Sequence, residues 1–355
     1  MDEIDLIYIY SPSWVEWSAG IRVLHYLCDL LNQNGYNAFL VLHGLETEPE
    51  TSPSLITPVL TKALFNKHTR EARRIVALYP EGIKGNPLNA EYVIRWVLNF
   101  PSLLGGLTTF DDETVLTYSK ALSDALGDES RARVLFIPAL KSCDFEAPFN
   151  HGKKSEGFGG RPYELIYAQK FQALGGKLSR LGINQFEITR FGRNAPSRKQ
   201  TLELIYNSNL VHVYENTTVI TEALLFGVSV LCHRNQFFDS LIAENELPMV
   251  GISWDESRLV AADRGHNLKV LKDAENKASS NLIEVFSNIE LIPKKRYASS
   301  AKLRYPKRGV ITKHSLDRAV IVLKQKGLKV FVRFFFNYIF RDKRPETEKR
   351  NVNED

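Results

Sequence analysis

The first 42 residues alternate between strand and helix signals, and this alternation constrains the fold more than any other feature. The apolar run Ile4–Tyr10 predicts a buried strand, and Asn37–Leu42 predicts another. Between them, apolar residues recur every three or four positions over Ile21–Leu31, as in an amphipathic helix. A strand, a helix and a strand in this order require a parallel sheet with a right-handed crossover. The chain therefore begins as an α/β domain.

The same alternation continues through the first half of the chain. Further strands are predicted at Arg74–Tyr79, Thr114–Tyr118 and Arg133–Ile137, and a helix at Ala90–Leu98. The segment Phe149–Gly160 then breaks the pattern, because it is polar and rich in glycine. We interpret this segment as a linker.

A second series of strands and helices follows the linker. Its predicted strands are Tyr163–Tyr167, Phe186–Arg190, Leu210–Tyr214 and Val228–Cys232. Its predicted helices are Phe171–Leu181, Ser197–Asn207, Thr218–Phe226 and Lys269–Phe286, with Ser197 as the N-cap of the second. This half has the same α/β architecture as the first.

The length and composition allow two such domains. The chain has 355 residues, of which 44% are hydrophobic and 25% charged, which excludes collagen-like, wholly disordered and disulfide-framework proteins. We expect a doubly wound, Rossmann-like domain over 1–150, a second over 151–310, and a helical tail over 311–355. Ligands of such folds bind at the carboxyl ends of the strands, so we expect a binding cleft between the domains.

The positive charge is concentrated in the tail. The net charge is +5, but residues 302–355 hold 15 Lys and Arg against 6 Asp and Glu. An aromatic run, Val330–Phe340, is bracketed by basic residues within 324–344. Eleven helical residues are too short to cross ~30 Å of hydrocarbon, so the pattern favours a helix on an anionic membrane surface. The alternative is that the tail packs on the first domain. No nucleic-acid-binding motif accompanies this charge, so no nucleic acid is expected.

The cysteines and the N-terminus favour a cytoplasmic protein. Cys28, Cys143 and Cys232 are far apart and form no CxxC pair, and two of them lie in apolar runs as buried residues do. The acidic N-terminus lacks the basic region that is typical of a signal peptide. With the basic tail, this predicts a peripheral protein on the inner face of the plasma membrane.

Several common site motifs are absent from the sequence. It contains no GxGxxG after the first strand, no GxxxxGK[ST] and no HExxH. The acidic cluster Asp111–Glu113 has no second cluster that would complete a metal site. We therefore expect neither a dinucleotide, nor a P-loop nucleotide site, nor a metal or other cofactor.

The stretch Tyr214–Val230 is the most informative part of the chain. It predicts a strand end, a polar turn, a helix and a glycine stop before the next strand. The backbone amides of Asn216–Thr218 would stand at the helix N-terminus, where free N–H groups and the helix dipole favour a diphosphate. Glu222 lies one turn further on, where a carboxylate can accept hydrogen bonds from a ribose diol.

This stretch resembles the nucleotide-binding motif of GT-B glycosyltransferases of the retaining group 1 type. Members of that class carry Glu-x7-Glu followed by a glycine and a Pro-Val strand. Here Glu215 and Glu222 are one residue closer together, and Ser229 stands where proline is usual. The shorter turn is similar to that of divergent members in polysaccharide and O-antigen biosynthesis.

The resemblance implies a set of site residues. Gly20 would lie in the loop that faces donor and acceptor, and Lys170, Arg190 and Arg193 would face the donor diphosphate. The expected nucleotide-sugar-binding residues are Gly20, Lys170, Arg190, Arg193, Glu215, Asn216, Thr217, Thr218 and Glu222. The competing interpretation is structural: a solvent-facing Glu222, a turn residue at Glu215, surface charges at the basic positions, and helix capping without a ligand at 216–218.

The implied function is transfer of a sugar, a hexose in the commonest case, from a nucleotide-sugar to a glycan or lipid-linked acceptor. The resemblance places this reaction in cell-surface polysaccharide or lipopolysaccharide biosynthesis, with retention of configuration. Helix amides and basic side chains would stabilise the leaving diphosphate without a metal. No catalytic residue is assigned, and Glu81 and Asp111 are the candidates. The alternatives are a non-hydrolysing nucleotide-sugar epimerase and an inactive scaffold of a polysaccharide assembly complex.

Overall fold

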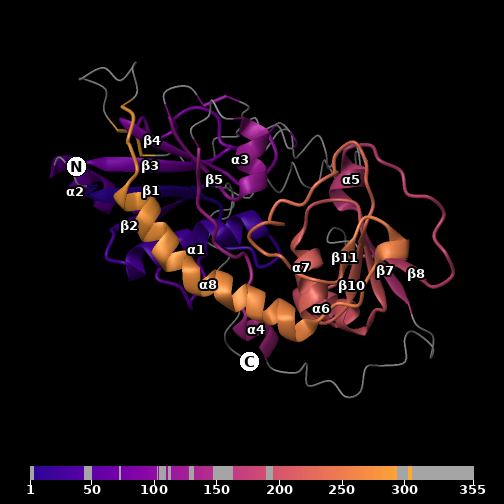
Figure 1. Cartoon of the computed structure of the whole chain (residues 1–355). Helices are drawn as coiled ribbons and strands as arrows, with labels where there is room; N and C mark the ends of the chain where they lie inside the picture. The colour runs from indigo at the N-terminus through magenta and orange to yellow at the C-terminus, as the bar shows by residue number, and fades with distance from the viewer. Residues whose placement is uncertain are drawn as a thin grey trace, which may run out of the picture. The chain divides into compact units, whose positions relative to one another are not determined.

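The structure of the chain is a computed structural model (Figure 1). It describes residues 4–43, 50–71, 73–101, 103, 109–110, 113–127, 132–146, 163–188, 195–293 and 303–305. The predicted tail, the whole predicted linker and three predicted site residues (Asp111, Arg190 and Arg193) lie outside the described residues.

The first domain is built on a six-stranded parallel sheet. Its strands are β1 (Leu6–Ser11), β2 (Ala38–Leu42), β3 (Ile75–Pro80), β4 (Tyr92–Val97), β5 (Thr114–Thr117) and β6 (Arg133–Val134). They pair in the order β2-β1-β3-β4-β5-β6. The chain leaves β1 for β2 on one side and later returns to β3 on the other. The order therefore reverses between β1 and β3, which makes this place the topological switch point of the sheet.

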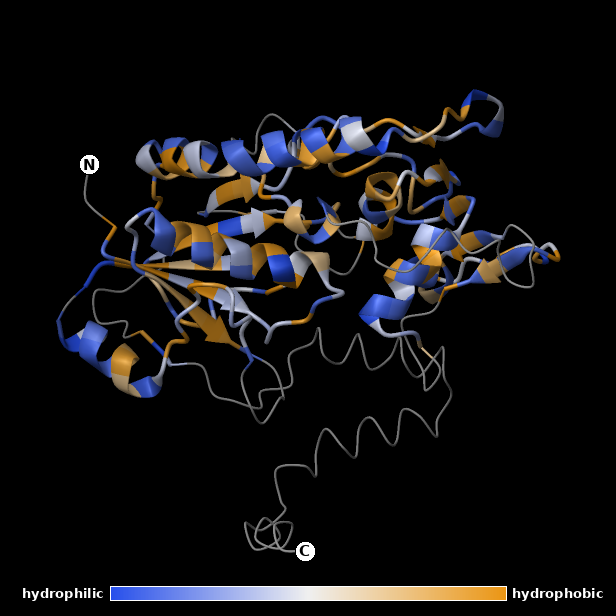
Figure 2. Ribbon diagram, turned by 90° about the horizontal axis from the view of Figure 1, so that it is seen from below, coloured by the Kyte–Doolittle hydropathy of each residue, from blue (hydrophilic) through white to orange (hydrophobic). Residues whose placement is uncertain are grey.

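Helices pack on this sheet through their apolar faces. They are α1 (Ala19–Gln33), α2 (Lys62–Arg70) and α3 (Lys120–Leu126), whereas the single turn α4 (Cys143–Glu146) places Phe145 in the core of the second domain. In α1, Leu27, Cys28 and Leu31 are fully buried against strand residues. Figure 2 shows the pattern: the strands of this sheet are mostly hydrophobic, whereas the helices alternate between hydrophobic and hydrophilic residues.

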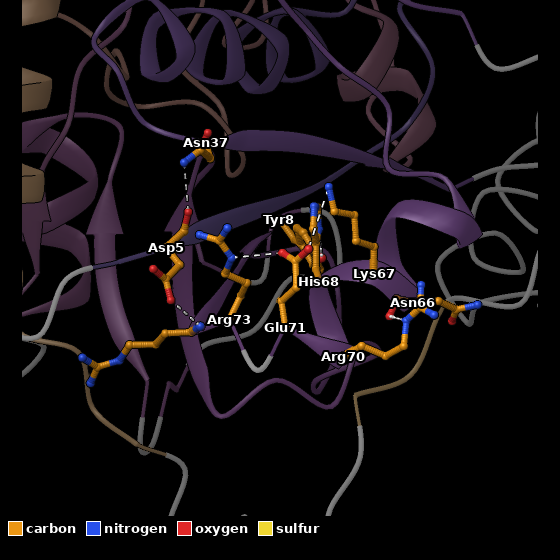
Figure 3. A network of polar contacts seen from close by, with 10 residues as sticks. Asp5, Tyr8, Asn37, Asn66, Lys67, His68, Arg70, Glu71 and Arg73 are labelled. Atoms are coloured by element: carbon orange, nitrogen blue, oxygen red, sulfur yellow. Dashed lines mark hydrogen bonds and ion pairs between the residues drawn. The ribbon is translucent and has the colours of Figure 1, made fainter.

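Polar contacts hold α2 at the edge of this domain (Figure 3). The hydroxyl oxygen of Tyr8, in β1, lies 2.8 Å from Nδ1 of His68 in α2, and both residues are buried. Arg73 Nε donates to Glu71 at 3.2 Å just after the helix. The backbone N–H of Arg74 donates to Asp5 at the amino end of β1. This cluster reaches the amino ends of the strands, so it supports the fold and is remote from the edge where ligands bind.

The second domain is built on a five-stranded parallel sheet. Its strands are β7 (Glu164–Tyr167), β8 (Gln185–Glu187), β9 (Leu210–Val213), β10 (Ser229–Cys232) and β11 (Ile252–Ser253). Their order is β11-β10-β9-β7-β8, so the switch point lies between β7 and β9. The structure thus contains two sheets, in each of which all strands are parallel and helices connect several of them. This confirms the predicted doubly wound α/β fold.

The helices of the second domain begin and end at recognisable signals. They are α5 (Gln169–Ala173), α6 (Arg198–Asn207), α7 (Thr218–Leu225), the 3-10 turn η2 (Glu256–Arg258) and α8 (Arg264–Ser287). Ser197 caps α6 as predicted, in a capping box with Gln200. Just past the end of α7, Gly227 adopts a positive φ of 75°, a conformation that glycine adopts without strain.

The long helix α8 contributes to both hydrophobic cores. Leu271, near its start, is fully buried in the core of the second domain. Leu282, Val285 and Phe286, near its end, are buried in the core of the first domain. The helix has 24 residues, which is roughly 36 Å, and this length lets one element serve both cores.

Two predicted helices are wrong. The segment predicted as a helix over Ala90–Leu98 contains strand β4, which lies between β3 and β5 and has Val93–Val97 buried on both faces. An apolar run without a clear period fits a central strand as well as a buried helix. The helix predicted over Phe171–Leu181 stops at Ala173, and Gly175 with φ of 96° follows it.

Candidate functional site

The switch point of the second sheet gathers five of the residues predicted to bind a nucleotide-sugar. Lys170 follows β7 in the first turn of α5, and Glu215–Thr218 connect β9 to α7. The strands β7 and β9 are neighbours and parallel, so both connections leave the same edge of the sheet. Open α/β sheets bind their ligands at this edge.

Glu215 and Lys170 tie the two connections together. The Glu215 carboxylate is 4% exposed and accepts hydrogen bonds from the backbone N–H groups of Lys170 and Phe171. In return, Lys170 Nζ donates to the carbonyl oxygen of Asn216 at 2.8 Å. Glu215 therefore caps the first turn of α5, and the lysine ammonium is held beside the start of α7.

The residues that lead into α7 also make structural contacts. The Asn216 side chain donates to the carbonyl oxygen of Ser240 and accepts from the N–H of Ile242, both at 3.0 Å. Thr217 is the N-cap of α7, and its hydroxyl accepts from the N–H of Val219 at 3.3 Å. These contacts fix the loop at the start of a helix whose first amides have no partner within the helix.

The first turn of α1 contacts the start of α7 through Thr218. Arg22 of α1 is 5% exposed, and its Nη2 donates to the Thr218 hydroxyl at 3.4 Å. Gly20 lies in the same turn of α1 as Arg22. A Cβ added at Gly20 would meet only Leu98 Cδ1, at 4.0 Å, so packing does not require glycine there.

Glu222 has a different environment from the predicted one. The sequence suggests an accessible carboxylate for a ribose, but this side chain is completely buried. Its Oε1 lies 2.8 Å from Nη2 of Arg198, at the first position of α6. Arg198 was not predicted as a site residue. A signal for it exists in the sequence, because a cation directly after an N-cap opposes the helix dipole and so requires a compensating anion.

A second unpredicted feature is a line of hydrogen-bonded groups across the second sheet. Nε2 of His212, in β9, lies 2.9 Å from Glu164, and its Nδ1 lies 2.9 Å from Nε2 of His233. The His233 ring stacks on Tyr214 with 4.4 Å between ring centroids. The line runs from the amino end of β7 to the residue before Glu215, so it adjoins the switch point.

Two groups in this line, His233 and Glu164, have pKa values below their ordinary values. Burial, together with the neighbouring His212, lowers the pKa of His233. Burial by itself would raise the pKa of Glu164, but hydrogen bonds from Gln185 and His212 outweigh it and hold the pKa below its ordinary value. Both shifts favour the folded state at neutral pH over acidic pH.

We expect acid to destabilise the protein partly through His233. In the unfolded chain this histidine takes up its proton near pH 6.5, whereas the folded protein resists protonation until lower pH. Its contribution to the unfolding free energy is therefore complete above pH 6.5 and is lost as the pH falls below it. Urea denaturation at pH 7.5, 6.5 and 5.5 should show that the free energy of unfolding decreases less with falling pH in His233→Gln than in the wild type. The exposed His266 provides the control His266→Gln, and equal slopes in all three proteins would contradict the prediction.

The switch point of the first sheet carries Glu81, a predicted catalytic candidate. Glu81 directly follows β3 and accepts a hydrogen bond from the N–H of Leu98 at 2.9 Å. Burial raises the pKa of its carboxyl group to about 7. A carboxyl group with a pKa near the working pH can exchange protons with a reacting hydroxyl.

Arg95 in β4 organises the loop that carries Glu81. Its guanidinium donates to both carboxylate oxygens of Glu113, at 2.8 and 3.0 Å, and to the carbonyl oxygens of Ile83 and Gly85. Arg95 is completely buried and Glu113 is 8% exposed. The loop after β3 is thus held in place by an arginine that is itself paired with a buried carboxylate.

Metal ligation has no candidate cluster in the part of the chain that the structure describes. Among those residues, no group of three or more His, Cys, Asp or Glu side chains is placed to hold a metal ion. Within the same residues, none of the helices combines the length and the apolar composition that crossing a bilayer requires.

No family model matches the sequence, and no curated protein matches it. Among solved structures, sucrose-phosphate synthase from Thermosynechococcus elongatus is similar, with 11% identity over 80% of this chain and 94% of that chain and a TM-score of 0.44. The glycosyltransferase SnogD from Streptomyces nogalater has 13% identity over 81% and 96%, with a TM-score of 0.34. Spinosyn rhamnosyltransferase SpnG, complexed with thymidine diphosphate, has 12% identity over 79% and 95%, with a TM-score of 0.34. At these identities and TM-scores the likenesses carry no argument, and the function of this chain is inferred from its own residues.

Proposed function

We propose that this protein is a glycosyltransferase that moves a sugar from a nucleotide-sugar donor to a glycan or lipid-linked acceptor. The observation that carries the proposal is the switch point of the second sheet, where the Lys170 ammonium is held beside the first turn of α7. A cation and the positive end of a helix dipole at this edge favour a diphosphate. The acceptor belongs, in this proposal, to the biosynthesis of a cell-surface polysaccharide.

The proposed reaction exchanges one bond at the anomeric carbon for another. The bond between that carbon and the diphosphate oxygen breaks, and the bond to the acceptor oxygen forms. Negative charge then develops on the leaving diphosphate, where Lys170 and the amides of α7 stabilise it. The acceptor hydroxyl loses a proton, and Glu81, with its raised pKa, is the candidate to accept it. The helix amides and the ammonium supply the electrostatic stabilisation in this scheme, and no metal takes part.

The basic tail would bring this enzyme to its acceptor. Residues 324–344 combine aromatic and basic side chains, a pattern that favours the surface of an anionic membrane. A lipid-linked acceptor is presented at such a surface, so we place the enzyme on the inner face of the plasma membrane.

The donor-binding part of the proposal is tested with Lys170. We expect Lys170→Met to weaken binding of the preferred nucleoside diphosphate by about tenfold to hundredfold, because a charge-assisted hydrogen bond contributes about 1.5–3 kcal/mol. Titration calorimetry with UDP, GDP, dTDP, CDP and ADP identifies the preferred ligand and measures the loss. Lys170→Arg retains the charge and should recover most of the affinity.

The control for Lys170 is Lys177→Met, because Lys177 is exposed and lies beyond α5. If the wild type binds none of the five nucleotides, the proposed function is wrong. If Lys170→Met binds as tightly as the Lys177 variant, the diphosphate does not lie at this switch point. Conversion of a donor sugar to its epimer without any acceptor would assign the site to an epimerase.

A further inference from the structure

We infer that Arg198 binds the phosphate groups of the donor, and that Glu222 is a positioning residue that acts through it. This inference rests on the proposed function and adds to it a cation that the motif pattern does not contain. It also gives the buried Glu222 a role that does not require contact with the ligand.

Arg198 lies at the edge of the second sheet where Lys170 and Glu215 also lie. It is the first residue of α6, which follows β8, and β8 pairs in parallel with β7. The connection from β8 to α6 therefore leaves the same edge as the connections that carry Lys170 and Glu215. Phosphate ligands in doubly wound folds lie along this edge.

Glu222 fixes the orientation of the guanidinium group. Its carboxylate is completely buried four residues into α7, and its Oε1 lies 2.8 Å from Nη2 of Arg198. Because a guanidinium group is planar and rigid, fixing one terminal nitrogen also fixes the other. Arg198 keeps 15% of its side chain exposed while Glu222 has none, so the arginine is the member of the pair that can reach a ligand.

The other terminal nitrogen of Arg198 has no hydrogen-bond partner among the residues that the structure describes. Nη1 is buried and makes no hydrogen bond to any described residue. Gln169, next to Lys170, also has a buried amide nitrogen, Nε2, without a hydrogen-bond partner among those residues. An unsatisfied buried donor costs about 1–3 kcal/mol. Two such donors at one edge are explained by a ligand that is rich in acceptor oxygens.

A purely structural role explains the ion pair less well. A cation in the first turn of a helix opposes the helix dipole, so Arg198 does not stabilise α6. Buried ion pairs also contribute little net stability compared with apolar residues of similar size. The ion pair therefore adds little to the stability of the fold. It does orient a guanidinium group, and such a group binds anions.

The experiment removes the ion pair without leaving a buried charge. Arg198→Met alone removes the cation beside the buried Glu222 carboxylate and is expected to destabilise the fold. The double variant Arg198→Met/Glu222→Met replaces both partners with apolar side chains and should unfold at a urea concentration close to that of the wild type. The exposed neighbour provides the control Lys199→Met. Binding is measured by calorimetry with the preferred nucleoside diphosphate and with the matching monophosphate.

We expect the double variant to bind the diphosphate at least tenfold more weakly than the wild type, with a smaller loss for the monophosphate. Lys199→Met should bind both ligands as the wild type does. Glu222→Gln keeps Arg198 charged and should lose less affinity than the double variant. A double variant that is folded and binds the diphosphate with wild-type affinity would overturn the inference and leave the proposed function standing. Absence of diphosphate binding in the wild type itself would overturn both.

Discussion

Replacing Arg95 with methionine should lower the free energy of unfolding by about 3–5 kcal/mol, the largest stability effect that we expect from one substitution. Arg95 is completely buried, and Glu113, its partner, is 8% exposed. Methionine leaves the carboxylate without its counter-charge and leaves the carbonyl oxygens of Ile83 and Gly85 without their donor. The loss of stability arises mainly because the buried carboxylate and carbonyl oxygens lose a donor, and less because the attraction between Arg95 and Glu113 is removed.

Urea denaturation of three variants separates these contributions. The double variant Arg95→Met/Glu113→Met should recover part of the loss, because no unpaired charge remains, but not the contacts to the loop carbonyls. The exposed pair of Lys120 and Asp124, each with 60% of its side chain exposed, provides the control. Lys120→Ala should cost less than about 1 kcal/mol. If Arg95→Met lowers the free energy of unfolding by as little as the control does, the pair of Arg95 and Glu113 does not stabilise the loop after β3.

Replacing Glu81 with glutamine should change activity and stability in opposite directions. If Glu81 accepts the proton of the acceptor hydroxyl, turnover should fall by about 10²–10⁴-fold. The folded carboxyl group has a pKa of about 7, above its ordinary value of 4.5, so the folded protein holds this proton more tightly. The unfolding free energy of the wild type therefore decreases as the pH rises from 4.5 to 7, by an amount on the order of 1–3 kcal/mol.

Glutamine cannot ionise, and it can still accept the hydrogen bond from Leu98. At pH 8 the glutamine variant should consequently be more stable than the wild type, whereas at pH 4.5 the two should be nearly equal. The wild-type rate should rise with pH through about 7, and this rise should be absent from the residual activity of the variant. Stability at pH 8 that increases with no loss of turnover would remove Glu81 from the catalytic candidates.

The two pairs in which Arg95 and Glu222 take part show how the fold supports its loops. In each pair one member is completely buried, but Arg95 lies within strand β4 whereas Arg198 is the first residue of α6. Arg95 uses its remaining donors on backbone carbonyls, whereas Arg198 has a buried nitrogen without a hydrogen-bond partner in the described part of the chain. This difference is why we assign a structural role to the first and a binding role to the second.

The sequence by itself determined the class of fold and the ends of several elements. Apolar periodicity and the strand–helix alternation are local properties, and they predicted two parallel-sheet domains. The cap at Ser197 and the stop at Gly227 were predicted correctly, since capping and positive φ depend on a few neighbouring residues. The turn after Tyr214 was likewise correctly predicted to connect a strand to a helix.

Only the tertiary structure decided which polar groups meet. Glu215 and Glu222 look alike in the sequence, yet one caps α5 and the other is buried against Arg198, 24 residues earlier in the chain. The same holds for β4, whose apolar run fits a helix or a central strand until β3 and β5 enclose it. Periodicity reports how each segment divides between inside and outside, but the partner of a buried charge depends on contacts between distant segments. For that reason the positions of strands, turns and helices could be predicted, whereas the partners of the buried carboxylates could not.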